Sequence, residues 1–341
     1  MLNQNFAERL LPWFQTNARV LPWRANKDPY RVWVSEIMLQ QTRVRQAIDY
    51  YNRFIARLPT VISLAECDEN ELLKLWEGLG YYSRARNLHK TAKIISDKFN
   101  GIFPGDYALL RRLPGIGDYT AGTVGAICFN LPTPSVDGNV LRVITRFTAS
   151  KADIASPETK QLLLAALQPV YEKTDDRGAL IQAIMELGAT VCVPSGAPKC
   201  DECPLNGLCK AHRLNLTDLI PVKGIKKEQT RENKTVFVVE YNGLLAVRKR
   251  PAQGLLAGLF EFPNTLGHLS EAEAVQQAKQ LGFNKITLIC KKTAVHVFTH
   301  RIWNMCVYSF AANEKNEDFL WTEPMAVVLP TAFKKLLPTT P

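Results

Sequence analysis

The sequence predicts a two-domain protein in which an all-α domain is followed by a smaller α+β domain. The first observation is length, because 341 residues are enough for about two separate hydrophobic cores. The second is that apolar residues recur at helical spacing, with little strand-like alternation, as far as about residue 213. The third is a change to strand-like runs after a polar segment. We therefore expect domains at 1–213 and 235–341, joined by a linker at 214–234.

The predicted helices of the first domain are short and follow one another closely. Their approximate ranges are 4–17, 30–44, 45–57, 69–78, 83–99, 106–112, 118–129, 139–149, 157–170 and 177–191.

The second domain combines strands with one helix. "TVFVVEYNGLLAVRKR" predicts a β-hairpin that turns at Asn242-Gly243, because this dipeptide favours the tight hairpin turn. "SEAEAVQQAKQLGF" predicts a helix that opens with the capping pair Ser270 and Glu273 and ends at Gly282. Further strands are expected at 285–290, 294–299 and 303–310.

Composition and charge limit the classes of function. With 46% hydrophobic residues the chain is globular, and no apolar run reaches the ~18 residues of a membrane span. The N-terminal stretch lacks the layout of a signal peptide, so we expect neither export nor a membrane. The formal net charge of +10 favours a polyanionic partner, although many basic proteins bind no nucleic acid.

"VWVSEIMLQQT" places a glutamate, Glu36, inside an otherwise apolar helical run. Its neighbours one turn away include Val32, Trp33 and Leu39, none of which can neutralise a carboxylate. A buried, unpaired carboxylate usually takes up a proton instead of staying charged. From the stretch alone, a narrow solvent-facing stripe or a distant arginine partner explains Glu36 equally well.

Two further segments have the form of helix starts. In "LRRLPGIGDYTAG", Gly115 and Gly117 permit a tight turn whose amides can approach an anion, and Asp118 can cap the following helix. Asp137, before Gly138-Asn139, reads on its own as the N-cap of a short helix. A Pro-Gly-x-Gly turn is also common as a plain helix–helix connection.

Four of the eight cysteines crowd into one loop, "CVPSGAPKCDECPLNGLC". Without an export signal, such a cluster suggests a metal rather than disulfides. The four are Cys192, Cys200, Cys203 and Cys209. The other four are expected in the core, at Cys67, Cys128, Cys290 and Cys306.

Taken together and in order, these segments resemble the helix-hairpin-helix DNA glycosylases that carry an iron–sulfur cluster, and within them the adenine DNA glycosylases of the MutY type. The resemblance covers nearly the whole chain. It is carried by "LPWR" (21–24), "YRVWVSEIMLQQT" (30–42), "LWEGLGYYSRARNLHK" (75–90), "LPGIGDYTAG" (113–122), "VDGNV" (136–140), the cysteine loop and "RPAQGLLAGLFEFP" (250–263).

The resemblance implies an activity. Such enzymes flip out an adenine mispaired with 8-oxoguanine or guanine in double-stranded DNA and hydrolyse its N-glycosidic bond. Glu36 matches the acid that protonates adenine N7, and Asp137 the ionised carboxylate that stabilises the developing sugar cation. Tyr119 matches a polar position beside the acid, and Asn139 one near the aspartate. The family also implies a monomer in the bacterial cytoplasm, associated with the nucleoid.

Binding residues carry over from the family one at a time. Trp23, Arg24 and Gln182 match positions that line the adenine pocket. Gln41 and Tyr81 match residues inserted into the stack around 8-oxoguanine, with Leu39 and Leu79 beside them. The turn glycines, Gly115 and Gly117, are expected to contact the DNA.

Tyr119 also separates two reactions. Relatives that cut the strand carry a lysine there, which forms a Schiff base with the sugar. Tyrosine therefore predicts base removal without an efficient lyase step. Two alternatives stay open: a bifunctional endonuclease III-like glycosylase/lyase acting on oxidised pyrimidines, and a non-catalytic iron–sulfur DNA-binding protein.

The cysteine loop implies a [4Fe–4S] cluster. Structural zinc sites more often use two close pairs of ligands, whereas here only Cys200 and Cys203 form such a pair. The spacing C-x7-C-x2-C-x5-C has one residue more than the family's first interval. That interval contains a single basic residue, Lys199, where the family offers several to DNA.

The second domain resembles the Nudix-like domain that reads 8-oxoguanine in these enzymes. Its helix lacks the REUxEE carboxylates that hold magnesium in Nudix hydrolases, which indicates a binding domain. The family's Phe-Ser-His loop appears as Phe298-Thr299-His300.

Overall fold

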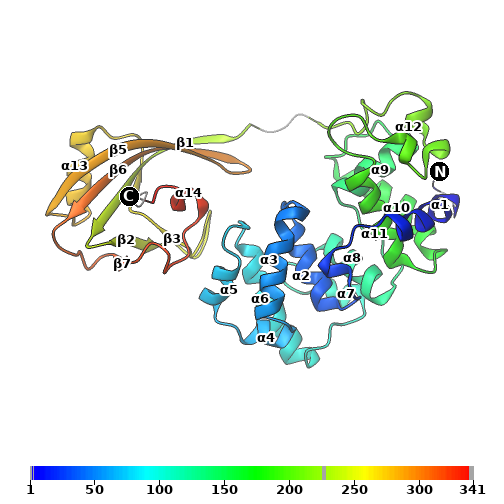
Figure 1. Ribbon diagram of the computed structural model, residues 1–341, viewed down its shortest axis with the longest axis horizontal. Coiled ribbons are helices and arrows are strands. Elements are labelled where there is room, and N and C mark those ends of the chain that lie inside the picture. The colour runs from blue at the N-terminus through cyan, green and yellow to red at the C-terminus, as the bar shows by residue number, and fades with distance from the viewer. Residues whose placement is uncertain (1, 3, 225–227, 338–341) are drawn as a thin grey trace. The chain divides into compact units, whose positions relative to one another are not determined.

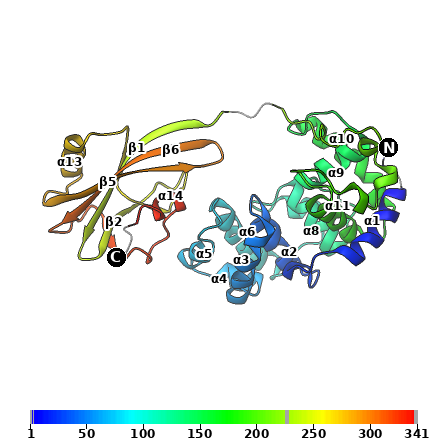
Figure 2. The same cartoon turned by 45° about the horizontal axis from the view of Figure 1, so that its top comes forward.

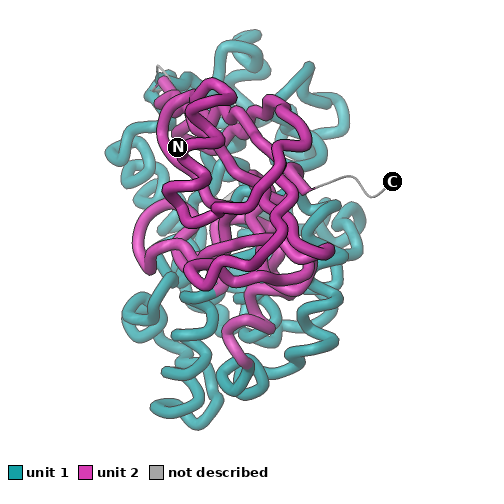
Figure 3. Tube along the Cα trace, turned by 90° about the vertical axis from the view of Figure 1, so that its left-hand side faces the viewer, with its two compact units in different colours: residues 1–67, 86–225 teal, residues 68–85, 226–341 magenta. Residues whose placement is uncertain are grey.

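The computed structural model describes residues 2, 4–224 and 228–337, and its chain divides into two compact units. Unit 1 is Met1–Cys67 with Arg86–Ile225, and unit 2 is Asp68–Ala85 with Lys226–Pro341 (Figure 3). None of the described helices is both long and apolar enough to cross a bilayer.

Helices make up the chain as far as residue 213 (Figure 1). In order they are α1 (Gln4–Asn17), η1 (Pro22–Arg24), α2 (Pro29–Leu39), α3 (Val44–Arg57), α4 (Val61–Glu66), α5 (Glu69–Leu75), α6 (Ser83–Phe99), α7 (Tyr107–Arg111), α8 (Asp118–Phe129), α9 (Gly138–Thr148), α10 (Pro157–Glu172), α11 (Arg177–Thr190), η2 (Cys200–Glu202), η3 (Asn206–Leu208) and α12 (Lys210–Arg213).

Unit 1 is organised around the packing of α8 against α2, α7 and α11. The residues in the middle of α8, from Thr120 to Ile127, have mostly small side chains and are all buried. α11 packs in turn on α9 and α1, and α9 also packs on α12, which follows the cysteine loop. This arrangement brings α2, α8, α9 and α11 around one region of the unit.

Beyond residue 229 the chain forms strands and two short helices. These are β1 (Thr230–Tyr241), β2 (Leu244–Lys249), β3 (Phe260–Glu261), β4 (Asn264–Leu266), α13 (Glu271–Gln280), β5 (Ile286–Val297), β6 (Arg301–Ala312), β7 (Leu320–Thr322) and α14 (Thr331–Lys334). The main strand order is β3-β2-β1-β6-β5, in which β1 and β6 are parallel and the other neighbours antiparallel. β4 pairs with β1, and β7 with β2.

Figure 2 shows the strands of unit 2 together with the helices α13 and α14. The sheet has a hydrophobic core on each face. Alternate residues of β1 divide between them, since side chains alternate along a strand. Val236 joins the core that contains Trp303 and Phe333 of α14. Phe237 joins the core that contains Ala274 and Ala278 of α13.

Several local predictions are confirmed. The hairpin turns at Asn242-Gly243, with φ of 48° and 78°, and β1 and β2 are antiparallel. Ser270 and Glu273 form the capping box of α13. Asp137 is the N-cap of α9.

Other element boundaries are corrected. α2 ends at Leu39 rather than 44, because Gln40 leaves the helical conformation and Gln41 has φ of 60°. The helix expected at 69–78 ends at Leu75, and α4 was not anticipated. The two strands expected at 285–290 and 294–299 are one strand, β5, with an irregularity between Leu288 and Cys290.

Asp118 does not cap α8. The N-cap is Gly117, without a side-chain cap, and Asp118 instead accepts from the Tyr107 hydroxyl at 3.1 Å and pairs with Arg111. Cys290, expected in the core, is exposed, whereas Cys306 is buried.

The expected linker at 214–234 is too long at both ends. Arg146 Nε donates to the Ile220 carbonyl at 2.7 Å, and Val222 forms a β-bridge with Asp153, so this stretch packs on unit 1. At the other end, β1 begins at Thr230. Residues 225–227 of the expected linker lie outside the described residues, as do 1, 3 and 338–341 of the expected domains.

Candidate active site

A single pocket of about 750 Å³ in unit 1 collects many of the predicted site residues. Its walls come from the η1 segment, α2 and the turn after it, α8, the start of α9, and α11. The predicted residues that line it are Trp23, Arg24, Glu36, Leu39, Gln41, Tyr119, Asp137, Asn139 and Gln182.

Glu36 lies on α2 and is buried, with 7% of its surface exposed. The Tyr119 hydroxyl donates a hydrogen bond to Glu36 Oε2 at 2.6 Å. Burial raises the pKa of Glu36 to about 7, because desolvation outweighs the opposing effect of the Tyr119 hydrogen bond, and the nearby Asp137 charge raises it further. This carboxyl group can therefore hold a proton near neutral pH.

Tyr119 comes from the first turn of α8 and keeps its own proton. Burial, followed by the charges of Glu36 and Asp137, raises the pKa of its hydroxyl well above the usual value. The hydroxyl is therefore a fixed donor to Glu36 rather than a base.

Asp137 is held at the N-terminus of α9 by two hydrogen bonds. Its Oδ1 accepts from the Val140 amide at 2.7 Å and its Oδ2 from Asn139 Nδ2 at 2.8 Å. Both favour the ionised form, but burial outweighs them and the pKa of Asp137 is raised overall. The polar turn that suggested an ionised carboxylate is thus more enclosed than its sequence indicated.

Arg142, on α9, is a pocket residue that the sequence analysis missed. It is buried, and its Nη2 donates to Asn139 Oδ1 at 2.8 Å and to the Gly188 carbonyl at 2.7 Å. Its Nε donates to the Cys192 carbonyl at 2.7 Å. The arginine therefore connects Asn139, and through it Asp137, to α11 and the cysteine loop. The sequence offers one sign of its role: a charged residue directly before Val143 in an amphipathic helix.

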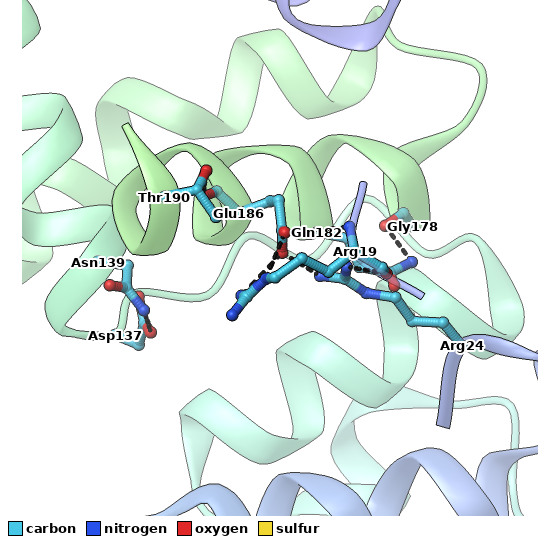
Figure 4. Close-up of polar contacts among 8 residues, drawn as sticks. All are labelled: Arg19, Arg24, Asp137, Asn139, Gly178, Gln182, Glu186 and Thr190. Atoms are coloured by element: carbon cyan, nitrogen blue, oxygen red, sulfur yellow. Dashed lines mark hydrogen bonds and ion pairs between the residues drawn. The ribbon is translucent and has the colours of Figure 1, made fainter. Parts of the chain in front are cut away.

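Glu186, on α11, was also missed, and it anchors two arginines at the pocket wall (Figure 4). This fully buried carboxylate pairs with Arg19 at 2.6 Å and Arg24 at 2.9 Å. Burial acts to raise its pKa, but the two arginines outweigh it and leave the pKa of Glu186 below its usual value. Arg24 is thereby fixed in the wall, beside Gln182, whose amide donates to the Gly178 carbonyl.

Two further predicted residues of unit 1, Gly115 and Gly117, do not line this pocket. Gly115, with φ of 75°, and Gly117 form the turn between α7 and α8. A Cβ on Gly115 would lie 2.6 Å from Asn87 Cβ, so the turn requires glycine there.

Unit 2 contains the rest, which are Leu79, Tyr81, Phe298, Thr299 and His300. Within it, the Tyr81 hydroxyl contacts the Thr299 hydroxyl. Tyr81, like Gln41 in unit 1, has a positive φ, 46° and 60° respectively. Left-handed backbone is costly for residues other than glycine and is concentrated at functional sites.

The four loop cysteines line one small pocket in unit 1. Arg146 Nη1 donates to Cys192 Sγ at 3.4 Å, and Asn206 Nδ2 donates to the Cys200 carbonyl at 2.9 Å. Lys199 is paired with Glu202 at 3.5 Å. The chain therefore brings four thiols and one buried cation together.

Comparison with known proteins matches this architecture. Residues 34–169 match the HhH-GPD superfamily base excision DNA repair proteins, and residues 235–339 match the NUDIX domain. The adenine DNA glycosylase of Buchnera aphidicola subsp. Baizongia pistaciae is 34% identical, over 97% of this chain and 95% of that protein. The Mus musculus adenine DNA glycosylase is also 34% identical, over 97% of this chain and 77% of that protein.

Among solved structures, a thermostable thymine-DNA glycosylase shares the fold, with a TM-score of 0.55 and 24% identity over 62% of this chain and 96% of that one. From the sequence relatives, the chain belongs to the adenine DNA glycosylase family, of the MutY type.

The pKa of Glu36 predicts how stability responds to pH. Its folded-state pKa of about 7 exceeds the usual 4.5, so the buried group favours folding while protonated, and this contribution is lost as pH rises through about 7. Glu36→Gln cannot ionise. Its free energy of unfolding relative to wild type should increase by roughly 2–3 kcal/mol from pH 5 to pH 8. Denaturant titrations at each pH measure this difference.

A matched control is Glu66→Gln, which removes an exposed carboxylate from unit 1. Its stability difference from wild type should change little over the same range. An equally flat response for Glu36→Gln would show that Glu36 is not a buried, proton-holding group.

Proposed function

We propose that this chain removes adenine mispaired with 8-oxoguanine or guanine in double-stranded DNA, by hydrolysis of the N-glycosidic bond. The observation that carries the proposal is the pairing of Glu36, whose pKa is about 7, with Asp137 in one pocket. A proton-holding carboxyl and a second carboxylate are the two groups that glycoside hydrolysis needs.

In the proposed reaction Glu36 gives its proton to adenine N7. The bond between C1′ and N9 then breaks, and its electron pair leaves with the neutral base. Asp137 faces the positive charge that develops on the sugar. A water molecule adds to C1′ and loses one proton, which balances the proton that Glu36 gave to the base. A pocket of about 750 Å³ is large enough for a flipped nucleotide.

Three wall residues are proposed to recognise the base. Trp23 offers an aromatic surface, while Arg24 and Gln182 offer hydrogen bonds to its edge. Arg24 suits this task because its pairing with Glu186 fixes its position before the base enters.

Strand cleavage is not part of the proposal. A lyase step needs an amine that can form a Schiff base, and the corresponding position is Tyr119. The described residues that line the pocket include one lysine, Lys27. Its ammonium group is already paired with Asp176 at 3.5 Å. Nicked product from purified enzyme would instead favour the bifunctional glycosylase/lyase.

The partner proposed is duplex DNA, bound by a monomer at the bacterial chromosome. The net charge of +10 and the turn formed by Gly115 and Gly117 suit phosphate contacts. Leu39 and Gln41 are proposed to enter the stack near the lesion. Residues in unit 2 are proposed to read 8-oxoguanine, namely Leu79, Tyr81, Phe298, Thr299 and His300.

The donor set fits a [4Fe–4S] cluster held by Cys192, Cys200, Cys203 and Cys209. All four thiols line one pocket, and the Arg146 cation beside them suits a negatively charged thiolate cluster. When bound, the cluster would cross-link the loop and stabilise its fold.

The catalytic assignment predicts the behaviour of two variants. Glu36→Gln keeps the shape but has no proton to give, so single-turnover adenine release should slow by at least ~10²–10⁴-fold. In wild type the rate should fall as pH rises through about 7, because the protonated form is lost. Asp137→Asn should also be slow, since it removes charge facing the sugar cation.

Binding to a duplex with a non-cleavable adenine analogue separates chemistry from recognition. Both variants should bind it about as tightly as wild type. Adenine release by Glu36→Gln at the wild-type rate would refute the general-acid role.

The cofactor assignment predicts about four iron atoms per chain and a broad absorbance near ~400 nm after purification without oxygen. Cys203→Ser should lose most of both, whereas Cys290→Ser, an exposed cysteine in unit 2, should keep them. Stoichiometric zinc in place of iron would exclude the cluster.

If unit 2 recognises 8-oxoguanine, a change in its loop should alter the preference for the base opposite adenine and leave the rate of base removal itself unchanged. Replacing the exposed Thr299 and His300 together by alanine should reduce the ratio of adenine release opposite 8-oxoguanine to release opposite guanine. The fully saturated rate opposite guanine serves as the control and should stay within about twofold. An unchanged ratio would assign recognition to other residues.

A further inference from the structure

Lys234, on β1 of unit 2, is a buried residue whose ammonium group forms no ion pair within the described part of that unit. Only 8% of the residue is exposed. In the described part of unit 2, no oxygen accepts a hydrogen bond from its Nζ and no carboxylate forms an ion pair with it. The Nζ is also not among the fully enclosed unpaired atoms of the described chain, so it reaches the surface. A lysine buried to this extent without an ion-pair partner is unusual, and its ammonium group remains open to an anion from solution.

The indole of Trp303 forms the wall beside this ammonium. Lys234 Nζ lies 4.7 Å from the ring centroid and Arg250 Cζ lies 5.8 Å from the same ring. Trp303 is almost fully buried, and its Nε1 donates to Glu232 at 2.8 Å, which fixes its orientation. Cation–π contacts stabilise the two cations but do not neutralise them.

The carboxylates nearby are already engaged. Glu232 pairs with Arg301 and accepts from Trp303, whereas Glu261 pairs with Arg248 and Arg250 and accepts from Asn264 at 2.9 Å. These two carboxylates face four cations, the three arginines and Lys234, so the cluster has a net charge of 4 − 2 = +2.

Arg250, near the same ring, has unused donor capacity. Its Nε donates to the Leu255 carbonyl at 3.1 Å and its Nη1 pairs with Glu261. For Nη2 the described residues provide no acceptor. Burial lowers the pKa of Lys234, while Glu232 acts to raise it, and a bound anion would favour its charged form further.

We propose that Lys234 and Arg250, above Trp303, form a binding site for a phosphate group. The site lies next to the loop proposed to read 8-oxoguanine, because the rings of Phe298 and Trp303 are 4.8 Å apart. The occupant is therefore a phosphodiester of the strand that carries the oxidised guanine. This assignment of the source rests on the proposed function, whereas the affinity for phosphate rests on the cluster alone.

The test uses Lys234→Met in the full chain. Methionine fills most of the lysine's apolar volume against Trp303 and leaves no acceptor unpaired, so the variant should be at least as resistant to denaturant as wild type. Each phosphate contact contributes about 0.9 to the slope of log binding constant against log salt concentration. The slope for a duplex with 8-oxoguanine opposite a non-cleavable adenine analogue should therefore fall by about 0.9.

Two matched variants control for general charge effects. Lys249→Met removes an exposed lysine from β2 of the same unit and should leave the slope unchanged. Lys234→Arg retains the cation and should retain the slope. Equal slopes for wild type and Lys234→Met, or equal losses for Lys234→Met and Lys249→Met, would overturn a DNA phosphate at this site.

A second measurement distinguishes DNA from a free anion. Inorganic phosphate, compared with chloride at the same ionic strength, should raise the melting temperature of wild type more than that of Lys234→Met if the site takes free phosphate. Absence of both this effect and the slope change would overturn the site altogether. Adenine release by the wild-type protein is measured separately. If no adenine were released, the proposed activity would be refuted, but the conclusion about phosphate binding would still stand or fall on its own measurements.

Discussion

The guanidinium of Arg142 is the contact on which the geometry of the pocket depends. It joins three separate parts of unit 1: the start of α9, the end of α11 and the first cysteine of the loop. Their close approach requires Gly188, where a Cβ would lie 2.6 Å from Asn139 Cβ. Because Arg142 is buried, its loss would leave several enclosed oxygens without a donor, which costs more than the hydrogen bonds themselves contribute. Asn139 and Asp137 are positioned by this network rather than by the helix cap alone.

Three carboxyl groups that line the pocket differ in the partners that surround them. Glu186 is neutralised by Arg19 and Arg24 and serves as a structural anchor. Asp137 receives two hydrogen bonds that oppose the effect of burial on its pKa. Glu36 receives only the Tyr119 hydrogen bond, and desolvation dominates its pKa. Burial raises the pKa of both Glu36 and Asp137, and the different roles proposed for them rest on the larger number of donors that Asp137 faces.

The sequence could predict what depends on local pattern. Asp137 as an N-cap followed from the helix start, and the hairpin from Asn242-Gly243. The apolar neighbours of Glu36 left three explanations open, and the structure shows that it is buried. Arg142 and Glu186 could not be found in this way, because their partners lie up to 167 residues away and leave no periodic signal. The end of α2 was misplaced for a similar reason, since Gln41 adopts a left-handed conformation that its residue type does not demand. Asp118 was misread as a cap because its tertiary partners, Tyr107 and Arg111, compete for the same carboxylate.

Buried charge separates structural from functional groups in both units. Glu186, Glu232 and Glu261 are each paired with arginine within their own unit, so their charges are compensated there. Among the described residues, neither Glu36 nor Lys234 forms an ion pair, and burial shifts the pKa of each toward its neutral form. Such groups lower stability unless something else completes them. For an acid that something is a proton, which it can pass on, and for an ammonium it is an anion, which it can hold. The catalytic role proposed for Glu36 and the phosphate site proposed at Lys234 therefore rest on the same physical deficit.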